Sequence, residues 1–170
     1  MNFFTAGVAS RVLVLAAICV GFTFATGQDA SEPKFTELTA TDREQLDRQR
    51  ATIAGAVKEH YGSSLTKTTK DLPTLQRLID DSVFSKSQTY KLQSLGVAFG
   101  DVLASALPLR WVMITDEYGT DPTLRYKHSR LNVNALTMIS KRIEGGERVS
   151  LSRLFQITRE QLADADKGFR

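Results

Sequence analysis

Cysteine is nearly absent from this sequence: among 170 residues there is one, Cys19. It lies in the N-terminal segment that we interpret below as a cleaved signal peptide. A mature chain without cysteine forms no disulfide bond. It also lacks a cysteine nucleophile and a thiolate ligand for a metal ion, so cysteine-dependent catalysis and thiolate metal sites are excluded.

Histidine is scarce as well, since the chain contains two, His60 and His128. His60 lies near the end of a predicted charged helix, and His128 lies in the basic stretch RYKHSR. We interpret both as solvated or turn residues rather than general bases. The chain has no Gly-x-Ser-x-Gly motif, so serine hydrolysis has no support in the sequence.

An excess of charge of one sign is also missing. The chain has 22 Lys and Arg against 19 Asp and Glu, interspersed, for a net charge of +3. Nucleic-acid binding calls for a concentrated basic face, so we expect no nucleic-acid partner. The apolar fraction of 42% and the length are ordinary for one folded domain.

The first 27 residues contain one charge, Arg11, followed by the uncharged run Val12–Ala25. This run is too short to span a bilayer comfortably. Small residues at Ala25 and Gly27 have the spacing that a signal peptidase reads. We therefore expect residues 1–27 to be a secretory signal peptide, cut after Gly27, and the mature protein to be periplasmic or secreted. The alternative is an uncleaved membrane anchor, which would be the protein's contact with the membrane.

Hydrophobic periodicity predicts mainly helices in the mature chain. Residues 28–40 lack periodicity and contain Pro33, so we interpret them as a flexible leader. Thr41 and Glu44 fit a capping box at the start of the first helix. Strands are predicted from Trp111 onward, where β-branched and aromatic residues gather. The predicted helices cover 41–62, 71–81, 85–108, 137–146 and 149–169, and the predicted strands lie within 110–119 and 123–136.

This order of elements predicts an α+β fold, with a small antiparallel sheet of about three strands covered by about five helices. We expect a single domain over residues 41–170. The helix over 85–108 is apolar almost all round and should be buried. Gly96 and Gly100 within it cost about 1 kcal/mol each in helix propensity, so we expect both to allow close approach of a neighbouring element.

The stretch from Leu95 to Arg142 resembles the bacterial family known as domain of unknown function 3806. The resemblance covers about residues 85–150 and implies a discrete domain, but it carries no catalytic role. The residues that carry it are Leu95, Gly96, Gly100, Trp111, Asp116, Glu117, Tyr118, Gly119, Asp121, Pro122, Leu124, Arg125, Tyr126, Met138, Ile139, Ser140, Lys141 and Arg142.

The segment DEYGTDP, residues 116–122, is the densest candidate site, and we interpret it first as a turn. Gly119 can adopt a positive φ, and one inward-facing acid should pair with Arg125 or Arg142. The acids do not have the spacing of an EF-hand loop, so we expect no metal and no cofactor. The candidate binding residues are Asp116, Glu117, Tyr118, Asp121, Arg125, Tyr126, Lys141 and Arg142.

A group of basic residues near this segment has two interpretations. They can converge on a phosphate or carboxylate, or they can form ion pairs with the nearby acids, which we favour because the acids lie close in sequence. The group consists of Arg125, Lys127, Arg130, Lys141 and Arg142.

Two functions follow from these patterns. The first is a non-catalytic exported protein that binds a partner protein or envelope component. The second is a hydrolase that uses a carboxylate near Asp116, Glu117 and Arg125, which requires a cleft that raises the pKa of one acid.

The signal-peptide interpretation predicts that the mature protein begins at Gln28. Sequencing the N-terminus of protein recovered from the cell envelope checks this, and recovery of Met1 in exported material would contradict it.

Overall fold

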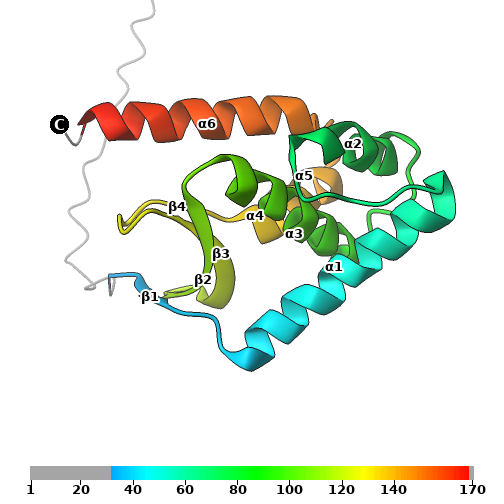
Figure 1. Cartoon of the computed structure of the whole chain (residues 1–170). Helices are drawn as coiled ribbons and strands as arrows, with labels where there is room; N and C mark the ends of the chain where they lie inside the picture. The colour runs from blue at the N-terminus through cyan, green and yellow to red at the C-terminus, as the bar shows by residue number, and fades with distance from the viewer. Residues whose placement is uncertain (1–31, 169–170) are drawn as a thin grey trace, which may run out of the picture. The chain divides into compact units, whose positions relative to one another are not determined.

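The structure is a computed structural model that describes residues 32–168, so the signal peptide predicted over residues 1–27 lies outside the described residues. The fold is α+β, as predicted, with helices around a four-stranded sheet (Figure 1). The helices are α1 Ala40–Tyr61, α2 Leu72–Asp80, α3 Thr89–Ala106, α4 Ala135–Met138, α5 Ser140–Glu144 and α6 Leu151–Gly168, with a 3-10 turn at Thr69–Asp71. The strands are β1 Lys34–Thr36, β2 Leu109–Asp116, β3 Gly119–Tyr126 and β4 Asn132–Val133.

The sheet is antiparallel throughout, in the order β1-β2-β3-β4. The additional strand is β1, which lies inside the segment 28–40 that the sequence analysis assigned to a flexible leader. That assignment is wrong for residues 34–36: Phe35 pairs with Ile114, and its ring lies 4.4 Å below the Arg125 guanidinium. Three residues are too few to show the alternation of apolar and polar side chains that is typical of a strand. This segment is a strand because it pairs with β2, and no local sequence pattern indicates it.

The first helix begins earlier than predicted. Its N-cap is Thr39, whose hydroxyl oxygen accepts a hydrogen bond from the Asp42 amide at 3.2 Å, while the Asp42 carboxylate accepts one from the Thr39 amide at 2.8 Å. The Thr39 hydroxyl also donates to the Asp42 carboxylate, at 2.7 Å, and this bond, followed by that from the Thr39 amide, holds the pKa of Asp42 below its ordinary value. The predicted box of Thr41 and Glu44 is therefore wrong, and Glu44 pairs with Arg48 at 2.9 Å instead.

Helix α3 is the centre of the fold. It packs against α1, α2, α4, α5 and β2, and Figure 1 shows it between α1 on one side and α6 on the other. Burial on nearly every side explains why its sequence is apolar almost all round. Within residues 32–168, no helix has the length and apolarity needed to cross a bilayer.

The two glycines of α3 make the predicted close approaches. A Cβ on Gly96 would lie 2.5 Å from the Leu136 carbonyl oxygen, and it would also meet the Ala135 carbonyl. A Cβ on Gly100 would lie 2.9 Å from Cη2 of Trp111. The missing side chains therefore let α4 and the indole of β2 pack directly on the backbone of α3.

Gly96→Ala is expected to lower the free energy of unfolding by roughly 1–3 kcal/mol, because the new methyl group meets backbone carbonyls that cannot rotate away. Gly55→Ala is the matched control: Gly55 lies on an open part of α1 with nothing within 4 Å of the added Cβ. That change is expected to raise the stability by about 0.5–1 kcal/mol. Urea denaturation measures both, and a Gly96→Ala protein as stable as the wild type would contradict the packing described.

Candidate functional site

The segment DEYGTDP forms the tip of the β2–β3 hairpin. Asp116 pairs with Gly119, and the Tyr118 amide donates to Oδ1 of Asp116 at 2.9 Å. Gly119 has φ of +130° with open space around it, so its backbone conformation rather than packing favours glycine. Tyr118 is 87% exposed, and a hydrogen bond to Glu117 raises the pKa of its hydroxyl. The turn interpretation of this segment is confirmed.

A small hollow of about 130 Å³ lies between this hairpin tip and α4–α5. It brings together four of the candidate binding residues, and it does not include the other four, Glu117, Arg125, Tyr126 and Arg142. The candidates that line it are Asp116, Tyr118, Asp121 and Lys141.

The predicted pairing of an acid of residues 116–121 with Arg125 or Arg142 is wrong. Arg125 donates to the carbonyls of Ser129 at 2.7 Å and His128 at 2.9 Å, and Arg142 donates to the Met138 carbonyl at 2.6 Å. Nearness in sequence does not bring Asp121 to Arg125, because four residues of extended strand cover roughly 13 Å.

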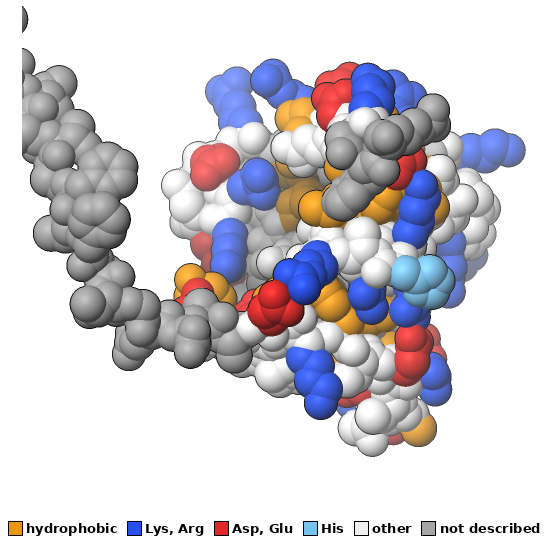
Figure 2. All heavy atoms as spheres, turned by 90° about the vertical axis from the view of Figure 1, so that its left-hand side faces the viewer, with side chains coloured by type: hydrophobic (Ala, Val, Ile, Leu, Met, Phe, Trp, Pro, Cys, Tyr) orange, Lys and Arg blue, Asp and Glu red, His pale blue; other side chains and the backbone are white. Residues whose placement is uncertain are grey.

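The alternative interpretation, in which the basic residues converge on one anion, does not hold for Lys127 and Arg130. Lys127 pairs with Asp166 and Arg130 with Glu32, both at 2.8 Å. Figure 2, which views the end of the molecule that faces left in Figure 1, shows basic side chains spread among acidic ones. Ion pairing is thus the interpretation that fits Lys127 and Arg130, with acids far away in sequence rather than with those of the hairpin. Tyr126 is a core residue, 4% exposed.

A larger cavity lies between α1, α3 and the loop that follows α1, and we call it the α1–α3 pocket. Its volume is about 430 Å³. Its apolar wall comes from two alanines of α1, one of α3 and a leucine of the loop, and basic and hydroxyl side chains complete it. The lining residues are Arg50, Ala51, Ala54, Lys58, Ser63, Ser64, Leu65, Lys67, Asp71, Ala98 and Asp101.

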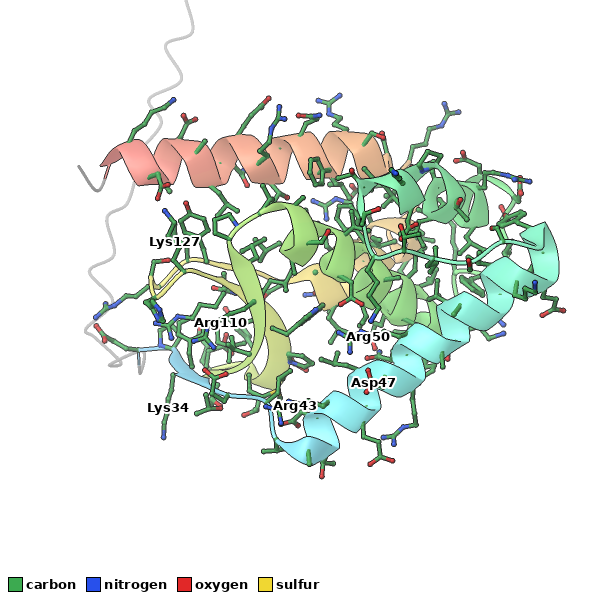
Figure 3. All side chains as sticks on the ribbon, in the orientation of Figure 1. Lys34, Arg43, Asp47, Arg50, Arg110 and Lys127 are labelled. Atoms are coloured by element: carbon green, nitrogen blue, oxygen red, sulfur yellow. The ribbon has the colours of Figure 1, made fainter. Side chains whose placement is uncertain are left out.

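The Asp101 carboxylate lies at one wall of this pocket and is fully engaged. It accepts hydrogen bonds from Nε of Arg50 at 2.7 Å, from Nη2 of Arg50 at 2.8 Å and from Nε1 of Trp111 at 2.9 Å. Figure 3 shows Arg50 extending from α1 into the space beside α3, near Asp47. The hydrogen bonds to Asp101 are the main reason that the pKa of Arg50 is raised. This carboxylate is therefore a structural anchor rather than a free base.

The second acid of the pocket, Asp71, fixes the loop. Its carboxylate accepts hydrogen bonds from the Thr66 amide at 2.9 Å, the Thr66 hydroxyl at 2.9 Å and the Thr68 amide at 3.3 Å. Although Asp71 stands at the N-terminus of α2, its side chain caps the 3-10 turn before that helix. Between Thr66 and Thr68, Lys67 has φ of +59°, an uncommon conformation for a residue with a side chain.

Two lysines of the pocket, Lys58 and Lys67, make no side-chain hydrogen bond or ion pair with the described residues. Because both acids already have partners, the free charge of the pocket is positive. This site was not predicted from the sequence. One signal was available: Asp101 is a charge inside an apolar helix, and a buried charge requires a partner.

The comparisons with known proteins give the family and the fold. The model of the family described as "Domain of unknown function (DUF3806)" matches residues 71–155, half of the chain, so the chain belongs to this family. A crystal structure of a protein from Bacteroides thetaiotaomicron VPI-5482 is similar, with a TM-score of 0.71 and 13% sequence identity over 78% of this chain. This chain covers 49% of that one, and the likeness shows the fold. No curated protein matches the chain.

Asp101→Asn is expected to lower the free energy of unfolding by roughly 2–4 kcal/mol, since it removes the charge that balances a half-buried guanidinium and places an amide N–H against Arg50. Asp47→Asn is the control, because Asp47 also bonds Arg50 at 2.9 Å but is 70% exposed; its effect should be about 0–1 kcal/mol. Chemical denaturation compares the two. Equal, small effects would show that Asp101 is not the anchor described.

Proposed function

We propose that this protein is a non-catalytic binding protein of the bacterial cell envelope, which holds a small molecule with an apolar body and a carboxylate in the α1–α3 pocket. The observation that carries this proposal is the division of the pocket into an apolar wall and unpaired cations. Its volume, about 430 Å³, falls within the ~300–1,000 Å³ typical of ligand pockets.

The lining supports an anionic ligand with an apolar body. Ala51, Ala54 and Ala98 leave room and remove apolar ligand surface from water. Lys58 and Lys67 have no internal partner and can attract a carboxylate. Arg50 has guanidinium N–H groups left over after its bonds to Asp101 and Asp47, and it can donate these to the same group.

Binding fits the site better than catalysis does. A general base needs a carboxylate with free lone pairs directed at a substrate, whereas Asp71 and Asp101 each accept several internal hydrogen bonds. The alternative hydrolase near Asp116 and Glu117 lacks the cation expected for it, since Arg125 is bonded to the carbonyls of residues 128 and 129.

The envelope location rests on the N-terminal sequence. The single charge at Arg11, the uncharged run after it and the small residues at Ala25 and Gly27 have the order of a secretory signal. A ligand with an acyl chain and a carboxylate is an envelope component of suitable chemistry. The same location suits an unidentified partner protein, which the pocket alone does not specify.

Octanoate is a probe with this chemistry, and isothermal titration calorimetry measures its binding. We expect saturable one-to-one binding to the mature chain, accompanied by a change in the fluorescence of Trp111, the single tryptophan, which bonds to Asp101 at the pocket wall. Octanol should bind more weakly. Lys58→Gln and Lys67→Gln should each weaken octanoate binding about 2- to 5-fold.

Ala54→Phe should abolish binding by filling the pocket. Ala163→Phe, at an exposed position of α6 outside the pocket, is the matched control and should bind as the wild type does. Octanoate affinity that is unchanged in Ala54→Phe would exclude the pocket as the binding site. Equal affinity for octanoate and octanol would exclude the carboxylate.

A further inference from the structure

A separate cavity of about 360 Å³ lies where the loop after α5 enters α6. Three arginines line it: Arg142 of α5, Arg148 of the loop and Arg153 of the first turns of α6. Val149, Leu154 and Ile157 supply apolar surface beside them, and Ile157 is 37% exposed. None of these residues belongs to the α1–α3 pocket.

The loop that carries Arg148 is held in place by the side chain of Gln76 from α2. Nε2 of Gln76 donates to the Val149 carbonyl at 3.0 Å, and its Oε1 accepts from the Leu151 amide at 2.8 Å. One amide thus fixes the backbone on both sides of Ser150. Arg148 and Arg153 are therefore attached to ordered backbone, which lowers the entropy lost when their side chains bind a ligand.

The positive charge of this cavity is balanced only in part by the described residues, at Arg142. Arg148 and Arg153 make no side-chain hydrogen bond or ion pair with residues 32–168. Arg142 gives one N–H to the Met138 carbonyl and forms a long ion pair with Glu147, at 4.0 Å. Like charges placed together repel one another, and an anion bound between them would remove that repulsion.

We infer that this cavity binds the phosphate group of a phosphate monoester whose organic part lies on the apolar wall. A phosphate monoester carries a charge of about −1.5 to −2 near neutral pH, which complements the two unpaired guanidinium groups of Arg148 and Arg153 better than the single charge of a carboxylate does. Guanidinium N–H groups match phosphate oxygens in paired hydrogen bonds. The apolar wall of Val149, Leu154 and Ile157 gives a place for a ring or chain next to the phosphate.

Phenyl phosphate is the probe, titrated calorimetrically into the mature chain in a chloride buffer. We expect saturable binding that is at least about 10-fold tighter than that of benzoate, which has the same ring but one charge. Arg148→Gln and Arg153→Gln should each weaken the binding at least about 10-fold. Both side chains are exposed, so melting temperatures should stay near that of the wild type.

Arg159→Gln is the matched control, because Arg159 is an exposed arginine of the same helix outside the cavity. It should leave phenyl phosphate binding unchanged. An equal loss in this control would reduce the effect to general electrostatic attraction and overturn the proposal. Failure to bind phenyl phosphate at millimolar concentration would also overturn it, as would equal affinity for benzoate.

Two further titrations test the organic part and the source of the phosphate. Inorganic phosphate should bind more weakly than phenyl phosphate, and equal affinity would remove the role of the apolar wall. Vesicles that contain phosphatidylglycerol present phosphate as a diester on a surface, and they should not retain the protein through Arg148. Retention that depends on Arg148, without binding of phenyl phosphate, would replace this proposal with a membrane contact. Ala54→Phe, which fills the α1–α3 pocket, should not affect any of these titrations.

Discussion

The carboxylate of Asp101 is the point at which three parts of this fold meet. It belongs to α3 and accepts hydrogen bonds from Arg50 of α1 and Trp111 of β2. The residue before it, Gly100, has no side chain, and this lets the Trp111 ring lie against the helix and present its N–H to the carboxylate. Without this anchor, an apolar central helix would contain an unbalanced charge, and α1 would lose its polar connection to the core. The same anchor forms a wall of the α1–α3 pocket, so the packing of the core also determines the shape of the candidate site.

Local sequence patterns predicted those structural features that depend on residues close together in the chain. Three features could each be predicted from one short stretch of the chain. They are the burial of α3 on nearly every side, the close approaches at Gly96 and Gly100, and the turn at Gly119. Features that depend on distant residues were not predicted in this way. The ion pair of Arg50 and Asp101 joins positions 51 apart, and β1 is a strand because β2 lies beside it. The capping box is a local feature, yet its position was predicted wrongly. Thr39 with Asp42 and Thr41 with Glu44 have the same spacing, and spacing alone does not show which pair caps α1.

The candidate residues near the hairpin show why a concentration of charged and polar residues in the sequence is a poor guide to a binding site. Acids, glycine and proline are concentrated in residues 116–122 because the turn of a β-hairpin favours these residue types within a few positions. Extended strands then carry neighbours in sequence apart at roughly 3.3 Å per residue, so Arg125 lies beyond the reach of the acids. Arg142, by contrast, lies beside residues that were not predicted to be its neighbours. Helix α5 and the loop that follows bring Arg142 together with Arg148 and Arg153. Both cavities with unpaired cations are made by helices and loops from separate parts of the chain.

The distribution of charge connects these observations. The net charge of +3 is small, but the acids of the described residues are largely used within the fold. Asp71 fixes a loop, Asp101 anchors the core, and Asp166 pairs with Lys127. Among the cations without a partner in the described residues, Lys58 and Lys67 line one hollow of the surface and Arg148 and Arg153 line another. A nearly neutral protein can in this way present locally positive cavities without the broad basic face that would attract nucleic acid. Because these cations are partly exposed, their attraction for anions must weaken as the ionic strength rises and the Debye length falls to about 8 Å at physiological salt.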